Sequence, residues 1–229
     1  MKYKLVTYFK MIKDNLHQIK KTIPEHVTLV AVSKTKPISD IQEAYDHGQR
    51  IFGENKIQEM VEKYEKLPKD IEWHMIGHLQ RNKVKYMAHF VSLIHGVDSL
   101  KTLIEINKQA KKHSRIINCL LQAKIAKEDS KFGLSFDHIE TVLNSQEIQS
   151  LENIRVVGLM GMATFSENKE LVGKEFQSLQ KFYKKLREKN SNLKILSMGM
   201  SGDYKLAITE GSNMVRIGSS IFGVRNYNA

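Results

Sequence analysis

Short apolar runs alternate along the chain with longer segments in which apolar residues recur every three or four positions. The run at 27–33, VTLVAVS, is rich in β-branched residues, which is typical of a strand buried on both faces of a parallel sheet. The segment 39–48 carries Ile41, Ala44 and Tyr45 on one helical face, and Ser39 is a suitable residue to cap it. A strand followed by an amphipathic helix is the repeating unit of an α/β fold.

This strand–helix unit repeats along the whole chain. The predicted strands cover residues 27–33, 50–52, 71–76, 90–94, 116–125, 155–162, 194–198 and 213–217. The predicted helices cover residues 3–22, 39–48, 55–67, a segment around Lys83, 99–110, 135–143, 169–189 and 204–210. Right-handed crossovers that bring the last strand beside the first give a (β/α)8 barrel. We therefore expect an α/β protein with a single (β/α)8 barrel domain over residues 1–229 and an additional N-terminal helix, with a doubly wound open sheet as the alternative.

The charge and cysteine content narrow the function classes. The formal net charge is +11, and much of the basic excess lies in predicted helices, which indicates solvated faces. No motif with stacking aromatic residues accompanies this charge, so we expect no specific nucleic-acid binding. The one cysteine, Cys119, lies in an apolar run and is expected to be a buried thiol in a cytoplasmic protein. No apolar run is long enough to cross a bilayer, so no membrane association is expected.

A lysine follows the first predicted strand, where charged residues are unusual. Lys34 comes directly after the buried run, and burial of an ammonium lowers its pKa and makes the amine a nucleophile suited to Schiff bases. A lysine that only extends from the strand end into water is the simpler interpretation of this stretch alone. Lys36 is a second candidate on the same side, but Lys34 lies nearer the buried run.

The last two loops of the predicted barrel are rich in glycine and serine. GMSGD at 199–203 follows the seventh strand and RIGSS at 216–220 spans the end of the eighth. Glycines let backbone N–H groups approach a ligand, serines add donors, and loops seven and eight form the usual phosphate site of this barrel. Because the carboxyl ends of all strands meet on one rim, these loops are expected to face Lys34. Such a site suits pyridoxal 5′-phosphate, or a Schiff-base aldolase acting on a phosphorylated sugar.

A pair of histidines four positions apart, His74 and His78, invites a metal interpretation. The segment is a strand leading into a turn, which does not project the two rings together as a helix would. No metal site is therefore predicted, and His74 is expected to pack beside Trp73. The fourth strand is expected to stop at His95-Gly96, and Asp98 or Ser99 is expected to cap the helix that follows.

Seven motifs, in order, resemble the pyridoxal phosphate homeostasis proteins, a family related to the barrel domain of alanine racemase. They are AVSKTKP at 31–37, FGEN at 52–55, WHMIGHLQRNK at 73–83, SKFG at 130–133, GLMGM at 158–162, MGMSGD at 198–203 and VRIGSSIFG at 215–223. The resemblance implies that Lys34 holds pyridoxal phosphate as an aldimine and that Asn55 is a pocket residue near the cofactor. It also implies that the phosphate is cradled by Ser201, Arg216, Gly218 and Ser219. Serine at 219, where family members often have threonine, keeps the hydroxyl.

The resemblance further implies a role in the balance of free and protein-bound pyridoxal phosphate, without established enzymatic turnover. Apo-forms of pyridoxal phosphate-dependent enzymes are the expected protein partners. Alanine racemases carry a second domain that supplies a catalytic tyrosine and the dimer contact, whereas this sequence ends about a dozen residues after the last predicted strand. We therefore expect a monomeric cofactor-binding protein, with a minimal racemase or Schiff-base lyase as the alternative.

Overall fold

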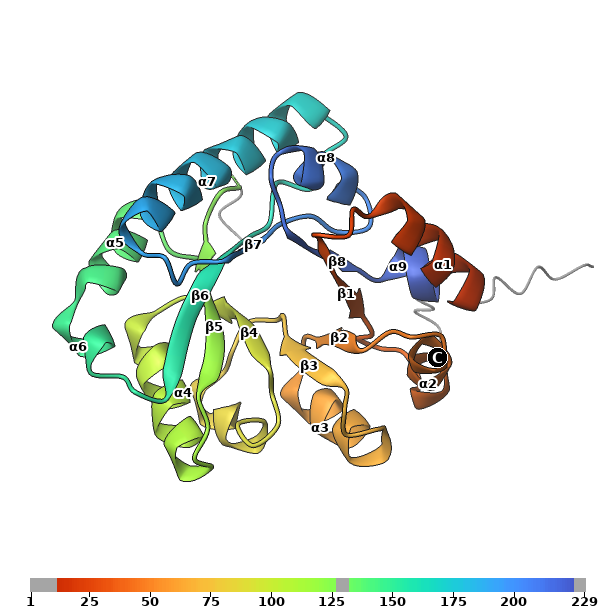
Figure 1. The fold of residues 1–229 in the computed structure, drawn as a ribbon, viewed down its shortest axis with the longest axis horizontal. Coiled ribbons are helices and arrows are strands. Elements are labelled where there is room, and N and C mark those ends of the chain that lie inside the picture. Colours follow the sequence, from red (N-terminus) through yellow and green to blue (C-terminus); the bar gives the residue numbers. More distant parts are fainter. Residues whose placement is uncertain (1–11, 127–131, 225–229) are drawn as a thin grey trace, which may run out of the picture.

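Eight parallel strands close into one barrel, and this confirms the predicted fold (Figure 1). The structure is a computed structural model, and it describes residues 12–126 and 132–224. The strands are β1 Thr28–Val32, β2 Ile51–Glu54, β3 Glu72–Met75, β4 Leu93–Val97, β5 Ile117–Ala123, β6 Ile154–Gly161, β7 Ile195–Ser197 and β8 Met214–Ile217. Because β8 pairs with β1, with Leu29 opposite Val215, the open-sheet alternative is excluded.

Helices surround the barrel on its outer side (Figure 1). They are α1 Ile12–Thr22, α2 Ile38–Asp46, α3 Ile57–Lys66, the 3-10 helix η1 Arg81–Tyr86, α4 Leu100–Lys112, α5 Phe136–Asn144, α6 Gln146–Gln149, α7 Lys169–Lys189, α8 Tyr204–Thr209 and α9 Ser219–Phe222. The bounds of α7 are those predicted from its periodicity. The described part of the predicted helix over 3–22 is α1, and its other residues lie outside the described ranges. No helix within 12–126 or 132–224 has the length and apolar character needed to span a bilayer.

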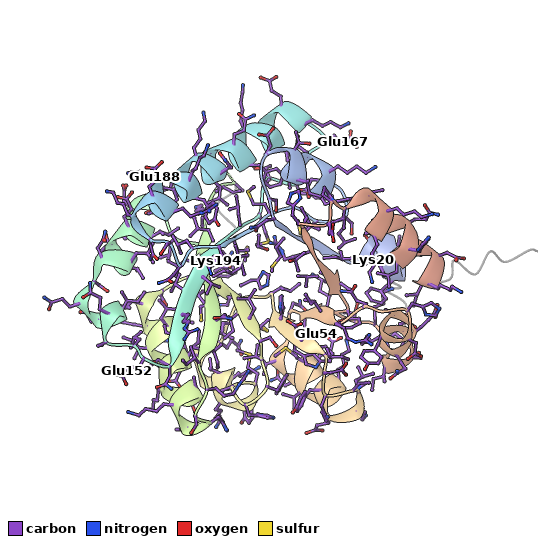
Figure 2. All side chains as sticks on the ribbon, viewed as in Figure 1. Lys20, Glu54, Glu152, Glu167, Glu188 and Lys194 are labelled. Carbon is purple, nitrogen blue, oxygen red and sulfur yellow. The ribbon has the colours of Figure 1, made fainter. Side chains whose placement is uncertain are left out.

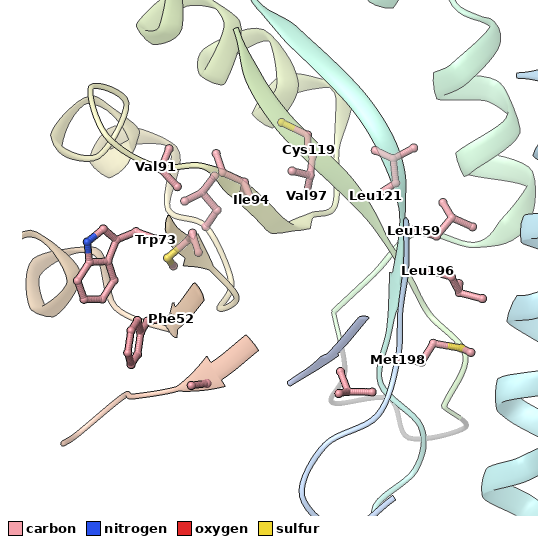
Figure 3. Close-up of a cluster of buried hydrophobic side chains, with 14 of the residues drawn as sticks. Phe52, Trp73, Val91, Ile94, Val97, Cys119, Leu121, Leu159, Leu196 and Met198 are labelled. Atoms are coloured by element: carbon pink, nitrogen blue, oxygen red, sulfur yellow. The ribbon is translucent and has the colours of Figure 1, made fainter. Parts of the chain in front are cut away.

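The alternation of side chains along each strand gives the protein two apolar regions. The larger one lies between the strands and the helices and includes Phe52 and Trp73, whose ring centroids are 6.1 Å apart (Figure 3). The smaller one includes Val30, Leu120 and Met160. Each fully buried side chain of this size contributes about 1.5–3 kcal/mol to folding. Both faces of the strands are therefore covered, which explains their continuous apolar runs.

The fourth strand differs from its prediction. Residues 90–94 were expected to form it, but β4 covers Leu93–Val97 and includes His95 and Gly96. Phe90 instead stacks on Tyr64 of α3, with ring centroids 4.0 Å apart. The strand extends past His95, whose buried ring is hydrogen-bonded on both nitrogens, and its register with β5 shifts between Ile94 and Val97.

Several helix ends also differ. The helix after β1 begins at Ile38 with Pro37 in the cap position, so the expected cap at Ser39 is wrong. The helix predicted around Lys83 is the 3-10 helix η1, and the short helix α6 was not predicted. The expected cap at Ser99 is confirmed, because its hydroxyl accepts a hydrogen bond from the backbone N–H of Thr102.

Candidate functional site

Four neighbouring strands carry the predicted site residues at or just beyond their carboxyl ends. Lys34 follows β1, Asn55 follows β2, Ser201 follows β7, and Gly218 and Ser219 follow β8. The pairing of β7 with β8, β8 with β1 and β1 with β2 makes these strands adjacent around the barrel. Topology therefore brings these segments to one side of the rim, although more than 180 residues separate Lys34 from Gly218 in the sequence.

The last two loops are in direct contact. The backbone N–H of Gly218 donates to the hydroxyl oxygen of Ser201 over 3.2 Å. A Cβ atom on Gly218 would lie 3.1 Å from the carbonyl oxygen of Val32, two residues before Lys34. A side chain at 218 would therefore press on the end of β1, and glycine lets the eighth loop lie against the strand that carries the lysine.

The turn after β1 separates the two candidate lysines. Lys34 is half-buried. Thr35 has a φ of 63°, and the N–H of Lys36 bonds to the carbonyl of Ser33 over 3.1 Å. The ammonium of Lys36 donates to the carbonyl of Phe222 at the end of α9 over 2.8 Å. Lys36 is therefore held against a helix, and the assignment of Lys34 as the lysine of the site stays a prediction.

Asn55 presents a buried acceptor to this region. Its side-chain Oδ1 is buried and has no hydrogen-bond partner among the described residues. An unsatisfied buried acceptor costs about 1–3 kcal/mol, so such an atom is expected to meet a donor from a ligand or a water. The loop after β3 packs closely here, because a Cβ on Gly77 would lie 2.4 Å from the carbonyl oxygen of Asn55.

Arg216 lies deeper than the sequence implied. It is within β8, two residues before Gly218, and is 3% exposed. Its guanidinium donates to the carbonyl of Ser197 over 2.9 Å, to the Ser197 hydroxyl over 2.6 Å and to the carbonyl of Gly161 over 3.1 Å. Burial lowers the pKa of Arg216 to about 10, which leaves it cationic at neutral pH. These contacts tie Arg216 to β6 and β7, so its predicted role as a phosphate partner stays a prediction.

A chain of hydrogen bonds continues from Arg216 through the barrel. We call Arg216, Ser197, His95 and His74 the inner network. Ser197 Oγ lies 3.3 Å from His95 Nδ1, and His95 Nε2 lies 3.1 Å from His74 Nδ1. Because Ser197 accepts from Arg216, its proton is available to His95 Nδ1, and His95 Nε2 then donates to His74. Burial lowers the pKa of His74 to about 3 and lowers that of His95 well below its usual value, so both rings are neutral.

The two histidines considered as metal ligands lie apart. His74 bonds to His95, whereas Trp73 belongs to the larger apolar region between the strands and the helices. The expectation that His74 packs beside Trp73 is therefore wrong. His78 Nδ1 is 3.2 Å from Asp98 Oδ2, and its ring stacks on Phe132 at 4.2 Å. Within 12–126 and 132–224, no three histidine, cysteine or acidic residues are grouped as a metal site would require. Residues 130 and 131 of the SKFG motif lie outside the described ranges.

A second buried polar group, absent from the predictions, lies against the turn that contains Lys34. We call Ser33, Glu54, Lys63 and Glu59 the outer cluster. Lys63 Nζ lies 2.8 Å from Glu54 Oε1 and 2.7 Å from Glu59 Oε1, and Ser33 Oγ donates to Glu54 Oε1 over 2.6 Å. Burial raises the pKa of Glu54 to about 7, against the opposing effect of Lys63. Figure 2 shows Glu54 close to the barrel, whereas Glu152, Glu167 and Glu188 lie at the periphery.

One signal in the sequence could have identified this cluster. Glu54 ends a strand whose other residues are apolar or glycine, and a carboxylate there needs a buried partner. Lys63, its partner, lies nine residues further along the chain, on the side of α3 that also carries buried Met60. A lysine on an apolar helical face after such a glutamate indicates a buried ion pair.

Comparison with known proteins places the chain in a family. The family model described as "Alanine racemase, N-terminal domain" matches residues 9–226. A pyridoxal phosphate homeostasis protein of Aquifex aeolicus is 40% identical over 201 residues, which is 87% of each chain. A protein of the same name from Escherichia coli is 37% identical over 212 residues, covering 90% of this chain and 88% of the relative.

Solved structures agree with these sequence relatives. PipY of Synechococcus elongatus matches without PLP at a TM-score of 0.87 and 33% identity, over 93% of this chain and 100% of PipY. The PipY structure with PLP bound matches over the same shares, at a TM-score of 0.84 and 32% identity. Alanine racemase of Clostridium difficile shares only the fold, at 16% identity and a TM-score of 0.75, over 96% of this chain and 57% of the racemase. The chain therefore belongs to the alanine racemase N-terminal domain family and, within it, to the pyridoxal phosphate homeostasis proteins.

Proposed function

We propose that this protein binds pyridoxal 5′-phosphate (PLP) at the carboxyl end of its barrel, holds it as a Schiff base on Lys34, and serves PLP homeostasis without catalytic turnover. The observation that carries the proposal is the position of Lys34 between two elements suited to this ligand. The contacting loops that follow β7 and β8 lie on one side of β1, and Asn55 follows β2 on the other. A relative of the same fold, PipY, is known with PLP bound.

Each end of the ligand has a candidate partner. Ser201 and Ser219 supply hydroxyl donors suited to a phosphate, and the N–H of Gly218 donates to Ser201 Oγ and so positions that hydroxyl. Asn55 Oδ1, which lacks a partner among the described residues, suits a donor on the ligand or on a bound water. Arg216 brings a buried positive charge beneath the two loops, and its bonds to Ser197 and Gly161 hold the guanidinium against β6 and β7. PLP, when bound, supplies an aldehyde that reacts reversibly with a primary amine.

The absence of turnover is supported by the arrangement of acid–base groups. Racemisation needs a base on each face of the substrate, and Lys34 supplies one. Every tyrosine within the described ranges lies on a helix, at Tyr45, Tyr64, Tyr86, Tyr183 and Tyr204, and none directly follows a strand. The relatives are named homeostasis proteins, which agrees with a binding role. A minimal racemase or Schiff-base lyase is the competing function.

The partners and location belong to the same proposal. A binding protein for a reactive aldehyde is useful where it can exchange that aldehyde with apo-forms of PLP-dependent enzymes, which are therefore the proposed recipients. We further propose that the protein acts as a monomer in the cytoplasm. The buried free thiol of Cys119, whose pKa is raised by burial, agrees with a reducing compartment.

The attachment of PLP to Lys34 is tested by replacing each candidate lysine. Lys34→Ala should lose the Schiff-base absorption band while its circular dichroism stays that of the wild type. The matched control is Lys36→Ala, whose ammonium bonds to Phe222 and which should keep the band. Loss of the band in Lys36→Ala but not in Lys34→Ala would show that the assignment is wrong.

The absence of turnover is tested with single L-amino acids in deuterated water. NMR of the Cα–H signal should show at most stoichiometric exchange, and PLP should pass to an added apo-enzyme. Steady loss of the signal over many turnovers, abolished by Lys34→Ala, would contradict a pure binding role and favour the racemase or lyase.

A further inference from the structure

The two peptide groups that flank Lys34 are both held by charged side chains of helix α3. The carbonyl oxygen of Ser33 accepts a hydrogen bond from Lys63 Nζ over 2.8 Å. The N–H of Thr35 donates to Glu59 Oε1 over 2.5 Å. Because these peptide groups lie on either side of the Lys34 Cα, their two bonds restrict the backbone rotations that aim the Lys34 side chain.

Lys63 is the centre of this arrangement. Its side chain is 5% exposed, and its ammonium contacts Ser33 O, Glu54 Oε1 and Glu59 Oε1 within 2.8 Å. These contacts account for the three N–H donors of an ammonium. Glu54 Oε1 also accepts from the Ser33 hydroxyl, so the residue before Lys34 is held through both its carbonyl and its side chain.

The outer cluster also links β1 and β2, two of the four strands that carry predicted site residues. Glu54 is the last residue of β2 and is covalently joined to Asn55, whereas Ser33 follows β1. A shift of Glu54 would therefore move the Asn55 backbone as well as the turn of Lys34. Among the described residues, none of the hydrogen bonds of the outer cluster reaches the loops after β7 and β8. The cluster therefore acts on the part of the site that contains Lys34.

We propose that Lys63, together with Glu54, is a positioning residue that fixes the backbone of Lys34 from outside the barrel and so directs attachment of the aldehyde to Lys34 rather than Lys36. This inference rests on the proposed function, because it concerns the same lysine. A turn released from α3 can rotate, and Lys36 lies only two residues away. The loss of restraint should therefore reduce both the rate and the selectivity of attachment.

The test compares Lys63→Met with Lys66→Met. Lys66 lies on the same helix and is exposed, so its replacement removes a similar charge without touching the turn. Each protein is mixed with PLP, reduced with borohydride at set times and digested, and the labelled lysine is identified by mass spectrometry. Labelling of Lys34 should slow by roughly tenfold or more in Lys63→Met, as expected when a charged hydrogen bond is lost, with a larger share on Lys36. Lys66→Met should match the wild type.

A double variant separates positioning from stability. Lys63→Met leaves Glu54 as a buried carboxyl without its cation, which can destabilise the fold. Glu54→Gln/Lys63→Met removes both charges, so its thermal stability should recover while labelling of Lys34 stays slow and unselective. Recovery of labelling together with stability, or wild-type labelling in a folded Lys63→Met, would overturn the positioning role. If the wild type itself is not labelled at Lys34, the proposed function fails instead.

Discussion

The outer cluster and the inner network are both buried and polar, yet they handle charge differently. The outer cluster contains two ion pairs of Lys63, with Glu54 and with Glu59, and its bonds reach the backbone around Lys34. The inner network contains one cation, Arg216, and passes through neutral histidines. The two arrangements come from different strands, β1 and β2 for the outer cluster and β3, β4, β7 and β8 for the inner network. The charged cluster bonds to the turn after β1, whereas the histidines and Ser197 form a chain of donors and acceptors that ends at Arg216.

The outer cluster and the inner network respond to pH in opposite directions. In the outer cluster, burial raises the pKa of Glu54 to about 7, so the folded state binds a proton more tightly than the unfolded state. In the inner network, burial lowers the pKa of His74 to about 3, so the folded state binds a proton less tightly. Acid therefore stabilises the fold through the first group and destabilises it through the second. Replacing one group at a time should separate the two effects.

The largest expected effect comes from the inner network. Between pH 6.5 and about 3 the unfolded chain protonates His74 and the folded chain does not, so the free energy of unfolding falls by about 1.4 kcal/mol per pH unit as pH falls. His74→Gln should reduce the pH dependence of denaturant unfolding by about this slope, while buried His95 keeps its own contribution. His17→Gln, at an exposed position on α1, is the control and should keep the wild-type pH dependence. An unchanged slope in His74→Gln would contradict a neutral buried ring.

A smaller effect of opposite sign is expected from Glu54. Between pH 4.5 and about 7 the folded chain keeps the proton that the unfolded chain releases, so the free energy of unfolding falls as pH rises, by about 3 kcal/mol in total. Glu54→Gln should remove this loss, so its stability relative to the wild type should improve with rising pH.

Exposed Glu62 on α3 offers the control, since Glu62→Gln should follow the wild-type profile. A constant difference between Glu54→Gln and the wild type across this range would show that Glu54 is ionised throughout, in which case Lys63 outweighs burial.

Arg216 should have a moderate effect on ligand affinity. Arg216→Gln should weaken PLP binding roughly tenfold, because a charged donor is lost from the site. Since the guanidinium lies beneath the loops and bonds to Ser197 and Gly161, we expect pyridoxal, which lacks the phosphate, to lose affinity by a similar factor. Titrations of wild type and Arg216→Gln with PLP and with pyridoxal measure the two losses of affinity. A loss confined to PLP would instead support the phosphate role that the family resemblance implied.

The fold was accessible from the sequence because parallel strands covered on both faces are continuous apolar runs. The prediction erred where polar residues lie inside strands. The sequence pattern ends the fourth strand at Ile94 and the second at Phe52, although His95 belongs to β4 and Glu54 to β2. Each is accommodated by partners from other elements, His74 and Ser197 for His95, and Lys63 for Glu54. The local sequence pattern around His95 or Glu54 does not reveal these partners, because they lie on other elements of the fold.

The candidate site was accessible in part for a similar reason. The order of strands places Lys34, Asn55 and the two glycine-rich loops on one side of the rim, which needs no knowledge of side-chain direction. The depth of Arg216 depends on the alternation within a four-residue strand, and its contacts come from β6 and β7. The hold on Lys34 comes from Lys63, 30 residues after Ser33. Such contacts follow from packing and not from spacing.

The smallest expected effect concerns Thr35, where the outer cluster contacts only the backbone. Thr35 is exposed and has a φ of 63°, a conformation that is unfavourable for a β-branched residue. Thr35→Gly relieves that strain but increases the freedom of the unfolded chain, so the free energy of unfolding should change by less than about 1 kcal/mol. Ser114→Gly is the matched control, because Ser114 also has a positive φ of 51° and follows α4, away from Lys34.

Attachment of PLP to Lys34 in Thr35→Gly should proceed at the wild-type rate, because glycine retains the N–H that donates to Glu59. The measurement is the borohydride labelling rate, compared with denaturant unfolding of the same variant and of Ser114→Gly. A tenfold slower rate with unchanged stability would mean that the Thr35 side chain, and not its peptide group, holds the turn. A wild-type rate would instead sharpen the contrast between the two groups, since the outer cluster would then act on the Lys34 turn through peptide groups alone, whereas the inner network is bonded through side chains to Arg216.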